Sequence, residues 1–124
     1  MTVYIDLQVC SKAENVDLDF LFHKPGKKHK ICDYSKTGSK LDYSQWCFYF
    51  DEIETHEAET AAKDFYRSIA GIKKQLIEYI HKTKSEVMIY FVISLGDEGV
   101  GITINERLLK LATVLQSPIH FDGL

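Results

Sequence analysis

The most highly charged stretch of the sequence is DEIETHEAE, residues 51–59, which carries five carboxylates and one histidine. Such a set could bind a metal ion, act as a general acid and base, or attract a basic partner. Acid–base catalysis requires two carboxylates in different environments, one of them desolvated, whereas this stretch is typical of a solvated surface. A metal site requires several ligands that converge from a rigid frame, and His56 is the only histidine here. We therefore expect no catalytic residues and no metal ligands in this stretch.

Part of the stretch is explained as the start of a helix. Thr55 precedes a long apolar stripe, and a threonine there can accept a hydrogen bond from a free backbone N–H of the first turn. Glu57 and Glu59 then fall in that turn, where carboxylates favour the positive end of the helix dipole. The three remaining carboxylates are Asp51, Glu52 and Glu54. They form either a solvated acidic edge or a docking surface for a basic partner, and both interpretations remain open.

Two other segments hold residues that could bind a ligand. HKPGKKHK, residues 23–30, is typical of a solvated basic loop, and contact with an acidic partner is the alternative. No aromatic residue is interleaved in it, which argues against binding to nucleic acid. GDEGVG, residues 96–101, resembles a dinucleotide-binding loop, but a strand rather than a helix follows it. Asp97 and Glu98 would also repel a pyrophosphate, so we interpret the segment as a hairpin turn. These two carboxylates join the candidate docking surface if the turn lies at the same edge. We expect no cofactor.

The hydrophobic pattern predicts the elements that position these residues. Apolar residues alternate in some segments and recur at spacings of three and four in others. The pattern predicts strands near residues 3–10, 43–53, 86–95, 100–104 and 119–121, a short helix capped by Asn15, a long helix from residue 58 to residue 80, and a helix capped by Asn105. Residues 24–40 predict a long loop. The order β-α-β-α-β-β-α-β indicates one α+β domain over residues 1–124, with helices packed on a mixed or mainly antiparallel sheet.

The composition of the chain excludes several classes of protein. The 124 residues are 45% hydrophobic and 27% charged, with a net charge of −3, which is typical of a globular domain and argues against a nucleic-acid binder. No apolar run approaches the ~20 residues of a membrane span, and no signal peptide is evident, so we expect a cytoplasmic protein without a membrane partner. Cys10, Cys32 and Cys47 show no zinc-binding spacing, and we expect reduced, partly buried thiols.

From the Trp46 strand onward, the residues resemble those of a known family. The matching features are the long helix with a basic end and the segment EVMIYFVISLGDEGVGITINERLLKLATVLQSPIHFD, in which a glycine-containing stretch, a short strand, a capped helix and a last strand follow one another. This arrangement resembles the bacterial family called domain of unknown function 4279. The resemblance implies a small cytoplasmic α+β domain, and the family supplies no catalytic residues to carry over. Domains of this kind look like the immunity proteins encoded beside polymorphic toxins.

These observations favour a protein-binding function over catalysis. We expect an immunity protein that masks the active site of a cognate toxin, a partner with a basic surface, and not an enzyme. The candidate partner-binding residues are Asp51, Glu52, Glu54, Glu57, Glu59, Asp97 and Glu98. The alternative is a small-molecule or peptide-binding domain, which predicts an enclosed apolar pocket lined by residues such as Trp46 and Tyr90.

Overall fold

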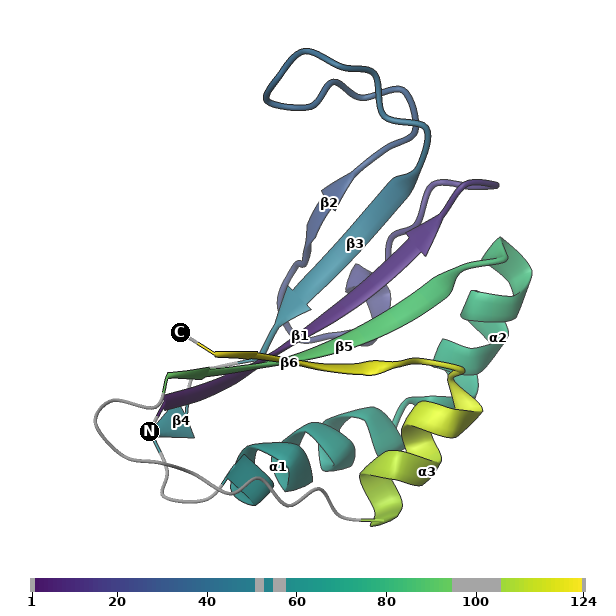
Figure 1. Ribbon diagram of the computed structural model, residues 1–124. Helices are drawn as coiled ribbons and strands as arrows, with labels where there is room; N and C mark the ends of the chain where they lie inside the picture. The colour runs from purple at the N-terminus through teal and green to yellow at the C-terminus, as the bar shows by residue number, and fades with distance from the viewer. Residues whose placement is uncertain (1, 51–52, 55–57, 95–105, 124) are drawn as a thin grey trace.

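The computed structural model describes residues 2–50, 53–54, 58–94 and 106–123. In chain order its elements are β1 (Thr2–Ser11), the 3₁₀ helix η1 (Asp19–Leu21), β2 (Lys27–His29), β3 (Ser44–Tyr49), β4 (Ile53–Glu54), α1 (Ala58–Ala70), α2 (Lys73–Thr83), β5 (Glu86–Ser94), α3 (Glu106–Val114) and β6 (Ile119–Gly123). The described strands form one sheet in the order β2-β3-β1-β5-β6, with β4 paired to β1. The three α-helices lie together on one face of this sheet (Figure 1). The predicted α+β class is confirmed.

The central strand is β1, which pairs antiparallel with β3 on one side and with β5 on the other. Its alternating sequence sends every second side chain toward the helices, where Leu7 lies level with Phe48 of β3 and Ile89 of β5. All three of these residues are at most 1% exposed. The other β1 residues on this core face are Val3, Ile5 and Val9. Among the described pairs only β5 and β6 run parallel, so the sheet is mixed and mainly antiparallel, as predicted.

The predicted long helix is two helices, α1 and α2, and the prediction of one continuous helix is wrong. The apolar stripe does run through both, from Ala61 to Ile80, and its buried members pack in the core. The helices are separated at Gly71 and Ile72, where the backbone N–H of Ile72 donates to the carbonyl of Ile69 in a tighter turn. Glycine in a helix interior costs up to about 1 kcal/mol relative to alanine, which makes this the weakest point of the stripe.

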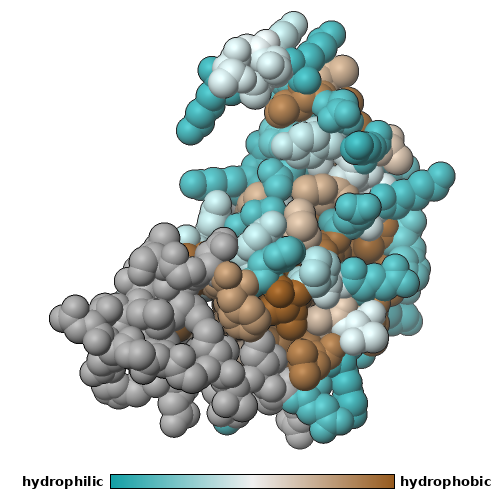
Figure 2. All heavy atoms as spheres, viewed as in Figure 1, coloured by the Kyte–Doolittle hydropathy of each residue, from teal (hydrophilic) through white to brown (hydrophobic). Residues whose placement is uncertain are grey.

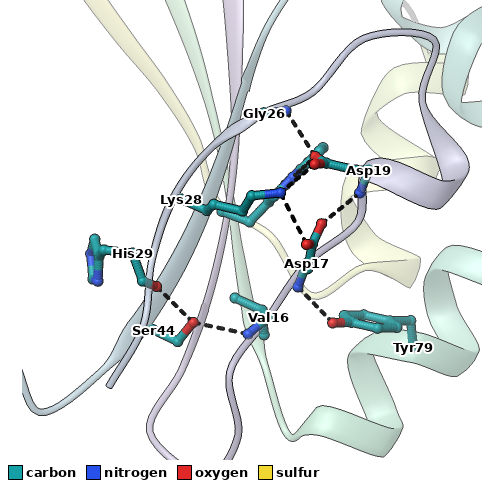
Figure 3. A network of polar contacts seen from close by, with 9 residues as sticks. Val16, Asp17, Asp19, Gly26, Lys28, His29, Ser44 and Tyr79 are labelled. Atoms are coloured by element: carbon teal, nitrogen blue, oxygen red, sulfur yellow. Dashed lines mark hydrogen bonds and ion pairs between the residues drawn. The ribbon is translucent and has the colours of Figure 1, made fainter. Parts of the chain in front are cut away.

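The predicted long loop at residues 24–40 contains a strand, β2, that pairs antiparallel with β3. Two contacts with residues distant in the sequence stabilise this strand. Lys28 forms ion pairs with Asp17 and Asp19, which precede it in the chain and partly neutralise its charge (Figure 3). Gly26 lets the backbone approach the core closely, because a Cβ there would lie 2.5 Å from Nε1 of Trp46. The basic segment is therefore a sheet edge and not a solvated loop.

The short helix expected after Asn15 is only a single 3₁₀ turn, η1. Asn15 does not cap it, because its side-chain oxygen instead accepts a hydrogen bond from the backbone N–H of Ile31 at 2.8 Å. Asp19, at the start of η1, accepts from the indole N–H of Trp46 at 2.8 Å and from the backbone N–H of Gly26 at 2.9 Å. These two hydrogen bonds fasten η1 and the start of β2 to the tryptophan of β3.

The C-terminal part of the described chain follows the predicted order. In α3 the inward-facing residues are buried, as the spacing predicts: they are Leu108, Leu111 and Ala112, with Leu115 just after the helix. The last strand is longer than predicted and reaches Gly123. The predicted strand at residues 100–104 and the predicted cap Asn105 lie outside the described residues.

Candidate binding face of the sheet

The face of the sheet opposite the helices, called here the open face, carries no helix among the described residues (Figure 1). Strand alternation and the pairing registers identify the side chains on it. Those whose side chains are described are Lys27 and His29 of β2, Gln45, Cys47 and Tyr49 of β3, Thr2, Tyr4, Asp6, Gln8 and Cys10 of β1, Glu86, Met88, Tyr90 and Val92 of β5, and His120 of β6. The open face is therefore rich in aromatic and amide groups, and it holds one carboxylate at its centre.

A row of five side chains crosses the middle of the open face and is called here the central row. Asp6 of β1 lies level with Tyr49 of β3 on one side and with Tyr90 of β5 on the other. At one end of the row, the ammonium of Lys27 lies 5.2 Å from the ring centroid of Tyr49. At the other end, the ring of His120 stacks on that of Tyr90 with centroids 4.7 Å apart. Each tyrosine is thus level with Asp6 on the neighbouring strand and contacts Lys27 or His120, while Tyr49 also lies 6.2 Å from Tyr4 between ring centroids.

The carboxylate of Asp6 is almost completely withdrawn from water, since the residue is 6% exposed. Its Oδ2 accepts a hydrogen bond from Nε2 of Gln8 at 2.8 Å, and Oε1 of Gln8 in turn accepts from Nε2 of Gln45 at 3.2 Å. Oδ1 is buried without a hydrogen-bond partner among the described residues. Burial raises the pKa of Asp6, and the Gln8 hydrogen bond and the charge of Lys27 oppose that rise. The central row therefore contains a desolvated acceptor with unused capacity.

The surroundings of the two cysteines on the open face favour their neutral thiols. Burial, followed by the negative charge of Asp6, raises the pKa of Cys47 to about 12. Burial also raises the pKa of Cys10. A cysteine nucleophile reacts as its thiolate, which these surroundings disfavour. Burial and the Asp6 charge raise the pKa of Tyr49 as well, so its hydroxyl stays protonated and can donate a hydrogen bond.

The acidic residues predicted from the sequence lie at one end of the sheet or outside the described part of the chain. Glu54 of β4 and Ser94 of β5 are both paired with Thr2, one on each side of β1. The chain therefore enters residues 55–57 and residues 95–105 from the same end of the sheet. Asp51, Glu52, Glu57, Asp97 and Glu98 lie outside the described residues, and only the backbone is described at Glu54 and Glu59. Their role in binding stays a prediction.

The pocket expected for a small-molecule ligand is not formed by the residues named for it. Trp46 is fully buried on the helix side of the sheet, and Tyr90 lies on the open face, so the two cannot line one cavity. An open groove of about 530 Å³ lies elsewhere on the molecule. It runs between the end of α2, the start of β5 and the end of α3, and contains Ile77, His81 and Val114. Neither residue of the expected pocket reaches it.

Exposed apolar side chains also occur on the helix side of the sheet, on α3 and at the β6 edge. Figure 2 shows hydrophobic atoms gathered over α3 and β6. The exposed apolar side chains there are Leu109 and Val114 of α3 and Phe121 of β6, each between 45% and 49% exposed. Phe121 follows His120 in β6 but lies on the opposite face of the sheet, level with Phe91.

Comparison of the chain with protein-family models, with curated proteins and with solved structures finds no match. Within the described ranges, no three or more His, Cys, Asp or Glu side chains gather in a way that could hold a metal ion. None of the helices in the described part of the chain has the length and apolar character needed to span a membrane.

Proposed function

We propose that this chain is a non-catalytic protein-binding module, an immunity protein that masks the active site of a cognate bacterial toxin. The observation that carries the proposal is the open face, where Tyr4, Tyr49 and Tyr90 lie together with His120 on a rigid sheet. Tyrosine combines a large apolar ring with a polar tip and is enriched among the residues that dominate binding energy at protein interfaces. A broad aromatic surface of this kind suits a protein partner better than a small molecule, which requires an enclosed cavity.

The position of the acidic segments supports a partner with a basic surface. Glu54 and Ser94 flank Thr2 at one end of the sheet, and the candidate carboxylates are close to them in the sequence. A group of like charges accelerates association with a partner of opposite charge. Toxins that cleave nucleic acid have such a surface because they bind phosphates. In this proposal the acidic end steers the toxin, and the open face supplies the contact area.

The proposal is tested by capturing partners of the tagged protein from its native cells at low and high salt. Three forms are compared: the wild type, the open-face double variant Tyr49→Ala/His120→Ala, and the control variant Tyr34→Ala. Tyr34 is 71% exposed in the loop between β2 and β3, so the control removes an exposed tyrosine outside the open face. We expect one stoichiometric partner that the wild type and Tyr34→Ala retain and the double variant loses. The purified wild type should also inhibit the activity of that partner.

Two results would contradict the proposal. The first is the absence of a stoichiometric partner at either salt concentration. The second is a partner that the double variant still captures at the wild-type level, which would place the interface elsewhere.

The steering role of the acidic end has its own test. The triple variant Asp51→Asn/Glu52→Gln/Glu54→Gln should slow association about tenfold at low salt and weaken its salt dependence. Its thermal unfolding should change little, because steering acts before contact. A loss of folding in this variant would instead show that the carboxylates are structural.

A further inference from the structure

Asp6 is a charged residue at a place where the fold does not need one. It lies on the open face, so it makes no contribution to the core between sheet and helices. It is nevertheless 6% exposed, and its Oδ1 has no hydrogen-bond partner among the described residues. A buried carboxylate with an unpaired acceptor opposes folding unless something binds it. The unpaired Oδ1 therefore indicates a binding group from outside the described chain.

The surroundings of Asp6 specify the shape and charge of that group. Tyr49 and Tyr90 stand on the strands either side of Asp6, and two strand spacings separate their backbones by about 10 Å. A flat group stacked between two rings needs ring planes about 7 to 8 Å apart, since each stacking contact takes about 3.5 to 4 Å, and side chains on strands about 10 Å apart can adopt that spacing. Lys27 contacts the ring of Tyr49, and His120 contacts the ring of Tyr90. A planar cation is complementary both to the tyrosine faces and to the carboxylate between them.

We propose that Asp6 anchors an arginine side chain of the protein partner, which inserts between Tyr49 and Tyr90 and donates hydrogen bonds to Oδ1. This inference rests on the proposed protein-binding function and names the chemistry of its central contact. Arginine fits because its guanidinium is planar, delocalised and weakly hydrated, and because it stacks on aromatic rings while pairing with a carboxylate. Oδ1 is covered in the free protein, and Tyr49, at 40% exposure, is the ring with room to move aside.

A variant at Lys27 should change arginine binding in the opposite direction to a variant at Asp6. Its ammonium lies over the Tyr49 ring, and its positive charge acts on Asp6. An incoming arginine would therefore meet a like charge at the edge of the site. Replacing Lys27 by glutamine removes that repulsion and should strengthen arginine binding, whereas replacing Asp6 by asparagine should abolish it.

The test uses a small probe, so that it does not depend on identifying the partner. Carbon-detected NMR of the full chain follows the Asp6 carboxyl carbon and the tyrosine rings during titration with N-acetyl-arginine amide. N-acetyl-citrulline amide is the matched control, because it has the same shape without the charge. We expect saturable shifts at Asp6, Tyr49 and Tyr90 with arginine, a dissociation constant on the order of 10 mM, and binding about tenfold weaker or absent with citrulline. Lys27→Gln should lower the arginine dissociation constant, and this variant carries the test if Asp6→Asn fails to fold.

Three results would overturn the inference. They are equal shifts with arginine and citrulline, saturable binding that leaves the Asp6 carboxyl unmoved, and unchanged arginine binding in folded Asp6→Asn.

The two proposals can fail separately. If a captured partner binds Asp6→Asn as tightly as the wild type while Tyr49→Ala/His120→Ala loses it, the arginine anchor is wrong and the binding face stands. If arginine amide saturates Asp6 and no partner is captured, the protein-binding function is wrong and the cation site stands.

Discussion

The hydrogen bonds of Asp19 join η1 and the start of β2 to Trp46, so replacing Asp19 should destabilise the fold. Asp19 accepts from the indole N–H of Trp46. It also accepts from the backbone N–H of Gly26 and pairs with Lys28 (Figure 3). The Lys28 pairing comes first among the causes that lower the pKa of Asp19 from 3.8 to about 2. Asp19→Ala removes both the acceptor and the charge, whereas Asp19→Asn keeps an acceptor oxygen and removes only the charge. The two variants therefore separate the contributions.

The charge contribution is the smaller of the two. A pKa lowered from 3.8 to about 2 corresponds to at most about 2.4 kcal/mol. The side chains of Asp19 and Lys28 are 29% and 39% exposed, so solvent screening reduces this to about 1 kcal/mol. Trp46 is fully buried, and leaving its N–H unpaired costs about 2 kcal/mol more. We expect destabilisation of about 1 kcal/mol for Asp19→Asn and about 3 kcal/mol for Asp19→Ala.

Urea unfolding of the three proteins at several pH values checks this reasoning. Because the folded-state pKa of Asp19 is depressed, its charge stabilises the protein above the unfolded value of 3.8. That contribution is lost as the pH falls through about 2. The difference in unfolding free energy between the wild type and Asp19→Asn should therefore disappear toward pH 2. The difference between Asp19→Asn and Asp19→Ala should persist. Equal stabilities for the two variants at pH 7, or a wild-type-to-Asn gap that does not change with pH, would refute the assignment.

Two further predictions concern local packing and thiol reactivity. Gly26→Ala should destabilise the fold by about 1–3 kcal/mol, because its Cβ would lie 2.5 Å from the Trp46 indole nitrogen. Gly71→Ala should stabilise the fold by up to about 1 kcal/mol, because no atom lies within 4 Å of the new Cβ. Urea unfolding measures both variants, and equal changes in stability for Gly26→Ala and Gly71→Ala would contradict the prediction. Iodoacetamide at mildly alkaline pH should modify exposed Cys32 while buried Cys47, whose pKa is raised to about 12, reacts only on unfolding. Peptide mass spectrometry measures the alkylation rates of Cys32 and Cys47. Comparable rates in the folded protein would contradict a buried Cys47 with a raised pKa.

Local periodicity accounts for the elements that were predicted correctly. The alternation from Val3 to Cys10 specifies a strand with one buried side, and β1 has that structure. The spacing of Leu108, Leu111 and Ala112 specifies a helix with one buried face, and α3 has that structure. Both signals are local, because the repeat of a strand or helix acts over a few residues. The break at Gly71 was visible as a weak point, but whether a helix continues through a glycine depends on what it packs against.

The candidate site depended on contacts that no local pattern contains. Asp6 is polar within an alternating strand, and the sequence places it on the side away from the core, where an exposed carboxylate would be expected. Only the pairing of β1 with both β3 and β5 brings Tyr49 and Tyr90 beside it and withdraws it from water. Strand register is set by long-range packing over more than forty residues of intervening chain in each case. The strand β2 likewise depends on its pairing with β3, and Asp17 and Asp19 pair with Lys28 there.

The amino-acid sequence by itself thus determined the class of fold, the main strands and helices and the face that each turns to the core, because these follow from side-chain period. The tertiary structure decided which strands are neighbours. That choice placed a desolvated carboxylate on the strand between two tyrosines and put Glu54 and Ser94 on either side of Thr2, because hydrogen-bonded strand pairs join residues that are distant in the chain.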